Sequence, residues 1–440
     1  MTRWRSSRPS AAADRRSDRV ERSPAPAPGG PDAMADLAPS SLNLFQLLRP
    51  IGRGAMGEVW LAEHKGQQAR VAIKLLHLEQ STDEGAAEAL FTEVRAQTLL
   101  AHGNIVSLLD HGTVDRTASA ASGNRFRDGS PFLVMEFVPG HPLQTRVGRM
   151  PWAEARSVLL QLLDALAHSH ARGIVHRDLK PGNVLLRQPS LDDITDAELV
   201  PKITDFGVAQ ALNRGAGETR EIVGTPSYMA PEQLTARWRD QGPWTDLYSL
   251  GCLAWSLLSG APPFGRGRSF VENRNAHLNV PPPRLQASVP VPDGFEDWLL
   301  RLLEKTPQDR YARAADAAAD LAALPSLARG SAAGGVVPLQ ALSTTGAGPR
   351  IPDDWRSPRP PALPPQLVGV GLNLYELHEP PLVGREDERT ALWSALRAVG
   401  AEGRGRAVLL QGPSGAGTTR LATWLARRAH ETGSALVLDA

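Results

Sequence analysis

The sequence predicts an α+β fold in which strand-forming segments come first, helical segments follow, and an incomplete α/β segment lies near the C-terminus. Three observations support this prediction. Glycine-rich and β-branched runs that are typical of strands lie within 45–74 and 132–138. Apolar residues recur at helical spacing from Trp152 to about Ala171. A stretch rich in Gly, Ala and Pro after Leu324 separates these segments from a strand, loop and helix pattern.

Composition sets limits on the class of protein. The 440 residues suggest two or three domains, because a domain usually takes about 100–200 residues. The formal charge of +1 indicates neither a nucleic acid nor an anionic membrane as partner. The single cysteine, Cys252, excludes an intramolecular disulfide and lies in an apolar run, where a small core residue is expected. The sequence shows no signal core and no apolar run of about 18–20 residues, so we expect a cytoplasmic chain without a membrane span.

Residues 1–43 are rich in Arg, Ala, Ser and Pro and have no apolar period, so they are predicted to form a disordered tail. A basic arm that binds nucleic acid is the alternative, since seven arginines precede Met34. Acidic residues interrupt that run and no aromatic stacking platform follows, so no nucleic acid partner is expected. Met34 is also a second plausible start, which would make the preceding tail an over-extended reading of the gene.

The central motif is His176-Arg177-Asp178-Leu179-Lys180-Pro181-Gly182-Asn183, which fits the pattern H-R-D-L-x-x-x-N. In this pattern an Asp carboxylate accepts the proton of an attacking hydroxyl, and the Asn holds a metal that bridges nucleotide phosphates. A second metal ligand is expected at Asp205, within Lys202-Ile203-Thr204-Asp205-Phe206-Gly207. Two hard oxygen donors suit Mg²⁺ that is held mainly by phosphates and water.

Two earlier motifs fit the same chemistry. Residues 51–61 contain G-x-G-x-x-G-x-V, in which glycines let backbone N–H groups approach phosphate, although a Gly-rich hairpin alone is often only a turn. The strand Val71-Ala72-Ile73-Lys74 ends in a lysine that, in isolation, would be interpreted as an exposed edge residue. A helical segment over 84–100 carries Glu93, which could pair with Lys74 and hold it against the α- and β-phosphates. The polar stretch 115–129 is predicted to be an inserted loop that does not pack, and 188–200 a second insertion.

In this order the motifs resemble the Hanks-type serine/threonine protein kinases of bacteria over about residues 45–323. The resemblance implies a two-lobed fold, with a small β-rich lobe and a large helical lobe. It implies that Asp178 is the base, that Lys180 neutralises the γ-phosphate, that Lys74 and Glu93 form the activating pair, and that Asn183 and Asp205 bind Mg²⁺. It places ATP against Ile51, Gly52, Gly54, Gly57, Val59, Ala72, Lys74, Met135, Glu136, Val138 and Leu185.

The same resemblance implies structural and regulatory roles. Asp246 resembles the buried acid of the large lobe, and Arg310 resembles the arginine that pairs with Glu232. Within 208–223 the hydroxyl residue Thr219 is a candidate phosphorylation site, because a phosphate there could order the loop against Arg177. An ordinary exposed loop threonine is the alternative.

The predicted organisation is a tail at 1–43, a kinase domain at 44–324, a linker at 325–378 and the start of a P-loop ATPase-like domain at 379–440. In this last part a strand at 407–410 precedes Gly412-Pro413-Ser414-Gly415-Ala416-Gly417-Thr418-Thr419, which is similar to the opening of AAA or STAND-type ATPase modules. The P-loop pattern G-x-x-x-x-G-K-[ST] needs lysine where this sequence has Thr418. A degenerate structural loop and a nucleotide site therefore both remain open. The chain stops before a doubly wound sheet could close, so a fragmentary sequence is expected.

Two classes of function remain. The first is an ATP-dependent kinase that phosphorylates serine or threonine hydroxyls of proteins, undergoes autophosphorylation through self-association, and acts in bacterial signal transduction under a C-terminal regulatory module. The second is a nucleotide-binding scaffold whose kinase fold recruits partners. The complete set of catalytic residues favours the enzyme.

Overall fold

The computed structural model describes most of the chain from residue 41 onward. The described ranges are 41–54, 57–76, 94, 97–123, 125–188, 199–206, 225–325, 351–356, 367, 369–371, 374 and 382–438. The predicted disorder of residues 1–43 is wrong at Ser41 and Leu42, which form a strand in which Leu42 is buried in the core of the small lobe. Residues 1–40 lie outside the described ranges, and so do Glu93 and Thr219. Expectations about those residues stay predictions.

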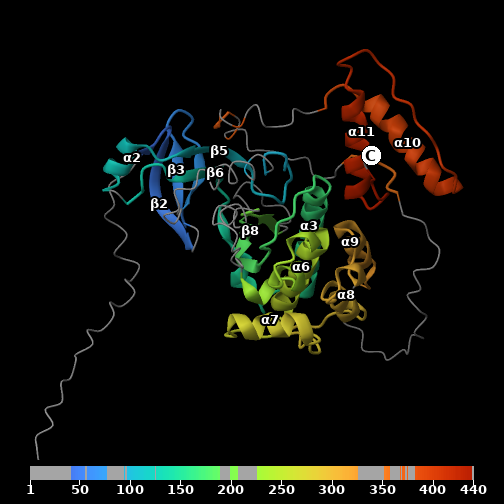
Figure 1. The fold of residues 1–440 in the computed structure, drawn as a ribbon, viewed down its shortest axis with the longest axis horizontal. Coiled ribbons are helices and arrows are strands. Elements are labelled where there is room, and N and C mark those ends of the chain that lie inside the picture. Colours follow the sequence, from blue (N-terminus) through green and yellow to red (C-terminus); the bar gives the residue numbers. More distant parts are fainter. Residues whose placement is uncertain are drawn as a thin grey trace, which may run out of the picture. The chain divides into compact units, whose positions relative to one another are not determined.

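A six-stranded sheet forms the small lobe (Figure 1). Its spatial order is β1-β2-β3-β4-β6-β5, and each neighbouring pair is antiparallel. The strands are β1 (Ser41–Leu42), β2 (Phe45–Gly54), β3 (Gly57–His64), β4 (Arg70–Leu76), β5 (Leu108–Thr113) and β6 (Pro131–Glu136). The strands expected around the glycine-rich turn, at Lys74 and at 132–138 are thereby confirmed.

Strand β4 shows how the sequence orients the sheet. Successive side chains of a strand point to opposite faces. Val71, Ile73 and Leu75 belong to one buried cluster, whereas Ala72 and Leu76 belong to another. Lys74 shares the second face by its position in the strand. The alternation therefore directs the lysine to the face that carries Ala72, while the other face packs in the core of the small lobe.

The inserted segment 115–129 departs from the prediction that it is an unpacked loop. Residues Arg116–Ala121 form helix α2, because the Asp115 side chain caps it by accepting a hydrogen bond from the Ala118 backbone N–H at 2.7 Å. Phe126 is buried edge-on against Trp60, with ring centroids 5.6 Å apart. Arg125 lies over the same indole and donates to Glu58 at 2.9 Å. The prediction was wrong because two residues, Arg125 and Phe126, give this polar segment an anchor on β3.

The large lobe is built around two long helices, α3 (Trp152–His170) and α6 (Pro243–Ser259). Helix α6 is buried along almost its whole length, including Cys252, which confirms that the cysteine is a core residue. A three-stranded sheet of order β7-β8-β9 lies at the start of this lobe. The remaining elements are β7 (Gly140–Pro142), β8 (Val184–Arg187), β9 (Val200–Ile203), α5 (Pro231–Leu234), α7 (Phe270–Asn279), α8 (Phe295–Leu302), α9 (Ala314–Ala323), η2 (Leu143–Arg146), η3 (Pro181–Asn183), η4 (Pro226–Tyr228), η5 (Trp238–Asp240) and η6 (Pro307–Asp309).

Beyond the large lobe the structure describes two further helices, α10 (Glu386–Glu402) and α11 (Thr418–Glu431) (Figure 1). Trp355, Trp393 and Ala429 are buried together at their contact. The strand predicted at 407–410 is not formed, since residues 403–412 have no regular structure and the Leu409 side chain is 79% exposed. A strand needs a neighbour to satisfy its backbone groups. Among the described residues none pairs with this segment, so its β propensity is not realised.

A short part of the predicted linker packs on the small lobe. Leu367 and Val370 join the cluster that contains Ile73, and Leu374 is fully buried in the cluster that contains Ala72. Gly371 passes so close to β5 that a Cβ atom there would lie 1.7 Å from the Leu109 carbonyl oxygen. Only glycine can occupy this position without moving the backbone.

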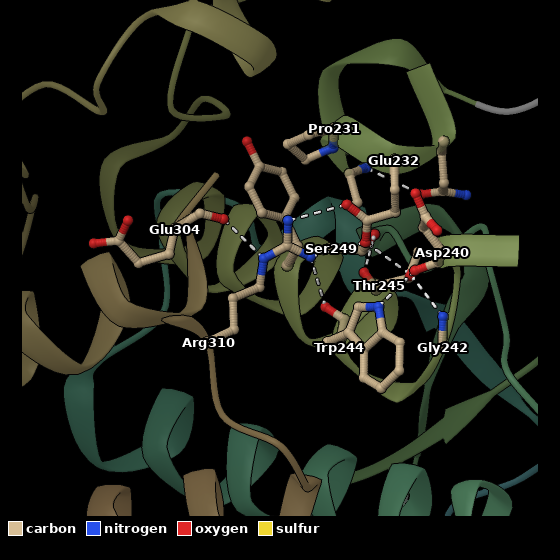
Figure 2. A network of polar contacts seen from close by, with 12 residues as sticks. Pro231, Glu232, Asp240, Gly242, Trp244, Thr245, Ser249, Glu304 and Arg310 are labelled. Atoms are coloured by element: carbon tan, nitrogen blue, oxygen red, sulfur yellow. Dashed lines mark hydrogen bonds and ion pairs between the residues drawn. The ribbon is translucent and has the colours of Figure 1, made fainter. Parts of the chain in front are cut away.

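An ion pair deep in the large lobe joins Glu232 to Arg310 (Figure 2). The two guanidinium Nη atoms donate to the two carboxylate oxygens at 2.9 and 3.0 Å, and Thr245 Oγ1 donates to the same carboxylate at 2.8 Å. The other guanidinium protons are donated to the carbonyl oxygens of Glu304, Trp244 and Lys305. Both side chains are almost completely buried, which confirms the expected pair.

Replacing Arg310 by methionine should lower the free energy of unfolding by about 3–5 kcal/mol, because Glu232 would be left as an uncompensated buried charge. Chemical denaturation would measure the loss. Arg116→Met is the control, because that arginine is exposed and its pair with Asp128 should contribute at most about 1 kcal/mol. Equal losses in the two variants would contradict this account.

Candidate active site

The small lobe contributes Lys74 to the site. Its Nζ donates to Asp205 Oδ1 at 2.8 Å, and the lysine side chain is 8% exposed. Asp205 follows β9 and has a left-handed backbone conformation, with φ of +65°. A non-glycine residue held in this region is typical of a functional site. The structure therefore brings together the predicted phosphate-binding lysine and one predicted metal ligand, although they are far apart in the sequence.

The loop at 176–183 places its predicted catalytic groups within hydrogen-bonding distance of one another. Lys180 Nζ donates to Asp178 Oδ2 at 2.7 Å, and Asn183 Nδ2 donates to the same oxygen at 3.0 Å. Asn183 Nδ2 also donates to the Asp178 carbonyl oxygen at 2.8 Å. The amide nitrogen is thus directed at the aspartate, which leaves the amide oxygen of Asn183 as the atom suited to a metal ion.

Lys180 joins this loop to the segment that precedes α5. Its Nζ donates to Thr225 Oγ1 at 2.8 Å as well as to Asp178. A second contact joins the same two segments, since Gln233 Nε2 of α5 donates to the Arg177 carbonyl oxygen at 2.7 Å. These contacts hold the catalytic loop against the chain segment that ends at Ala230-Pro231-Glu232.

Asp246 fixes the start of the loop at 176–183 through hydrogen bonds. Its Oδ2 accepts hydrogen bonds from the His170 ring and from the backbone N–H of His176, and its Oδ1 accepts from the backbone N–H of Arg177, each at 2.8 Å. Burial raises the pKa of Asp246, but the hydrogen bond from His170 and the nearby histidines outweigh it and hold the pKa below its usual range. The carboxylate therefore stays ionised. It fixes the left-handed backbone of Arg177, whose φ is +66°.

The His176 ring connects the catalytic loop to the segment of Asp205. Its Nε2 donates to the Thr204 carbonyl oxygen at 2.9 Å, and its Nδ1 accepts from the Asp178 backbone N–H at 3.2 Å. The ring also contacts Phe206, with centroids 4.6 Å apart. In addition, the Thr204 backbone N–H donates to the Asn183 carbonyl oxygen at 3.0 Å. The two predicted metal ligands, Asn183 and Asp205, therefore lie on segments that are tied together by backbone and ring contacts.

The predicted nucleotide-binding residues come from four strands of one sheet, β2, β3, β4 and β6, and from β8. Val59 lies opposite Lys74 on β3 and β4, and Ala72 lies opposite Met135 on β4 and β6. Gly57 has a φ of +149°, and a Cβ atom there would lie 1.8 Å from the Leu75 carbonyl oxygen, so this position requires glycine. The other predicted contacts lie on these strands or just beyond them: Ile51, Gly52 and Gly54 on β2, Glu136 on β6, Val138 after it, and Leu185 on β8.

The segment around Glu136 is held by a buried ion pair that the sequence analysis did not predict. Lys202 Nζ donates to Glu136 Oε2 at 2.9 Å, and each side chain is 8% exposed. The Glu136 backbone N–H donates to the Ser107 carbonyl oxygen at 2.9 Å. Lys202 is the one charged residue in the short apolar strand β9. A single charge in an apolar strand was the sequence signal that could have indicated a buried ion pair.

Some predicted residues are not assembled with this site in the described part of the chain. Glu93 and Thr219 fall outside it, so the pair of Lys74 with Glu93 and the phosphorylation site stay predictions. The second loop, with Gly412, Gly417, Thr418 and Thr419, lies at the start of α11. Gly417 has a φ of +84° and immediately precedes Thr418, the first residue of that helix.

The protein kinase domain family matches residues 45–320 of this sequence. The chain therefore belongs to the protein kinase family, and the arrangement of Lys74, Asp178, Asn183 and Asp205 occurs within the matched region.

The relatives are bacterial serine/threonine kinases. The serine/threonine-protein kinase Pkn1 of Myxococcus xanthus is 41% identical over 61% of this chain and 36% of its own length. PknA of Mycobacterium tuberculosis is 36% identical over 61% of this chain and 58% of its own length. PkaA of Streptomyces coelicolor is 37% identical over 60% of this chain and 47% of its own length. The chain thus spans well under two thirds of the length of these relatives.

Among its described helices, none combines the length and the apolar character that crossing a bilayer requires.

Replacing Lys202 by methionine should destabilise the protein by about 3–5 kcal/mol, because the Glu136 carboxylate would be left buried without its cation. The double variant Lys202→Met/Glu136→Leu should recover most of this loss, since it removes both charges and keeps apolar volume. Urea unfolding of the wild type, the two single variants and the double variant completes the cycle. A double variant less stable than Lys202→Met would contradict the pairing.

Proposed function

We propose that residues 44–324 transfer the γ-phosphoryl group of ATP to serine and threonine hydroxyls of proteins. The observation that supports this most directly is the hydrogen-bonded set formed by Asp178, Lys180 and Asn183, with Lys74 bound to Asp205 on the neighbouring segment. The family and the serine/threonine kinases among its relatives support the same reaction. Phosphoryl transfer depends mainly on positioning and on neutralising charge, which is what this set of side chains can supply.

The proposed roles follow from the atoms that face one another. Asp178 accepts the proton of the substrate hydroxyl, and the hydrogen bonds from Lys180 and Asn183 fix its carboxylate in one orientation. Lys180 brings an ammonium beside that carboxylate, where it would neutralise charge on the transferred phosphoryl group. Thr225 accepts a second hydrogen bond from Lys180 and keeps the ammonium in place. Lys74 would hold the α- and β-phosphates, with Glu93 as its proposed partner.

The protein kinase family implies ATP and a divalent metal, and we propose Mg²⁺ as that metal. The residues present fit it, because the carboxylate of Asp205 and the amide oxygen of Asn183 are hard oxygen donors on segments that contact each other. Asn183 and Asp205 would hold the ion, which when bound would offset the negative charge of the nucleotide phosphates. Lys74 and Asp205 would exchange their mutual contact for contacts to phosphate and metal.

We further propose that residues 379–440 form an ATPase-like regulatory module. The loop 412–419 enters α11 through a left-handed glycine, as a phosphate-binding loop would, but Thr418 supplies no ammonium. Proposed partners of the whole protein are substrate proteins with exposed serine or threonine and a second copy of the chain for autophosphorylation. We propose a cytoplasmic location and a role in signal transduction.

Asp178→Asn and Lys74→Met should each reduce phosphotransfer by about 100-fold or more, because each removes a charge from the reacting centre. Incubation with labelled ATP, Mg²⁺ and a generic basic protein would measure the reaction. Lys65→Met is the control, since that lysine is exposed and its ammonium donates to the Asn43 carbonyl oxygen, which belongs to no predicted site. Near-normal turnover by either active-site variant would refute the assignment.

Thr219 should carry phosphate in the active protein, because about −1.5 to −2 charges at this position could order the loop against Arg177. Mass spectrometry of protein purified from cells would detect the modified peptide. Thr219→Ala should lower kinase activity. Arg177→Gln should also lower kinase activity, but Thr219 of this variant should still be phosphorylated when an active kinase molecule is supplied. A fully active protein without phosphate at Thr219 would reject this proposal.

A further inference from the structure

The last residue of helix α11 contacts the large lobe through a nearly buried ion pair. Glu431 Oε1 lies 2.5 Å from Arg172 Nη1 and 3.1 Å from His168 Nδ1. His168 belongs to α3, and Arg172 follows that helix by two residues. The side chains are 12% exposed for Glu431, 12% for His168 and 16% for Arg172. A carboxylate with so little access to water must be compensated where it lies.

The Glu431 carboxylate is compensated by the positive charge of Arg172 and by a hydrogen bond from His168. Burial lowers the pKa of His168 to about 4, so the ring is neutral at pH 7 and its Nδ1–H donates to Glu431. In this tautomer the other ring nitrogen, Nε2, is an acceptor, and it is buried without a hydrogen-bond partner among the described residues. Burial raises the pKa of Glu431, but the hydrogen bond from His168 and the charge of Arg172 lower it below its usual range overall. Arg428 donates to the second carboxylate oxygen at 3.1 Å.

Further contacts extend the surface beyond this ion pair. Gly433 lies against α9, where a Cβ atom built on the glycine would be 3.1 Å from the Ala315 Cβ atom. Ser434, which follows Gly433, is only 3% exposed. Arg428 Nε also donates to the Trp355 carbonyl oxygen at 2.7 Å, which joins the aromatic cluster of Trp355 and Trp393 to the same helix. The contact is therefore a packed surface that includes apolar as well as charged groups.

We propose that the large lobe carries an intramolecular docking surface, formed by His168, Arg172 and Ala315, whose partner is the C-terminal end of helix α11. Glu431 is the ionic anchor of this interface. The surface borders the support of the catalytic loop, because His170, two residues from His168, donates to Asp246. The interface stands independently of whether the loop 412–419 binds nucleotide and of the catalytic activity of the chain.

A disulfide trap tests the docking in the full chain. In the variant Ala315→Cys/Gly433→Cys the two Cβ atoms would be close to the distance of about 3.5–4.5 Å found in disulfides. Mild oxidation should link them within one chain and increase mobility in a non-reducing gel. The native Cys252 is fully buried and does not compete. The control Ala315→Cys/Ser414→Cys places the second thiol near the other end of α11, about 20 Å away for a helix of this length, and should not crosslink.

The ionic anchor is tested in the same background. Adding Glu431→Lys sets an ammonium against Arg172 and should slow crosslinking by about tenfold or more. Glu402→Lys, which changes an exposed residue of α10 paired with Arg406, should leave the rate unchanged. Equal rates in the Glu431→Lys and Glu402→Lys proteins would overturn the proposal. A disulfide between two chains in place of the internal one would overturn it as well.

A second measurement needs no cysteines and covers the case in which the crosslinking variants fold poorly. Hydrogen exchange of the backbone amides at 166–172 is compared between the wild type, Glu431→Lys and Glu402→Lys. Loss of the docked helix should speed exchange in this segment only for Glu431→Lys, because the covering contacts are removed while α3 keeps its own hydrogen bonds. Identical exchange in all three proteins would show that α11 does not cover the large lobe.

Discussion

The carboxylate of Asp246 is the interaction on which the site depends. It is fully buried and accepts hydrogen bonds from the end of α3 through His170 and from the backbone N–H groups of His176 and Arg177. An ionised carboxylate in a dry interior is costly unless its oxygens are satisfied, and here three donors satisfy them. The same contacts hold the left-handed backbone at Arg177, one residue before Asp178. A structural charge in the core thus determines where the proposed catalytic charge lies.

Much of this fold could be predicted because the signals were local. The strand at 71–74, the helical period of α3 and the spacing within 176–183 each lie in one stretch of sequence, and the structure agrees with them. The contacts that assemble the site are not local. Lys202 was not recognised because its partner Glu136 is remote in sequence. Helix α2 was missed because its anchor on Trp60 depends on tertiary packing that polar composition does not reveal.

The C-terminal part shows the opposite error, in which a local signal was not realised. Residues 407–410 have the composition of a buried strand, yet Leu409 is exposed and none of the described residues pairs with it. Helices α10 and α11 form because their backbone hydrogen bonds are internal and their apolar faces meet each other at Trp393 and Ala429. A single strand cannot satisfy its backbone N–H and C=O groups within itself and needs a neighbouring strand. The difference explains why the helices of the predicted module are present while its strand is not.

The packing of Leu374 in the small lobe bears on where the kinase domain physically ends. Its cluster includes Ala72 and Met135, which are predicted to contact ATP, and Gly371 fits against β5 where no larger residue could. The family match ends at residue 320, so these residues belong to the folded unit without belonging to the shared sequence. A protein shortened to the family boundary would expose the apolar surface that Leu374 covers, in the cluster that also contains Ala72 and Met135. Its affinity for adenine compounds would then be measured with Ala72 and Met135 lacking one of the residues that pack against their cluster in the longer chain.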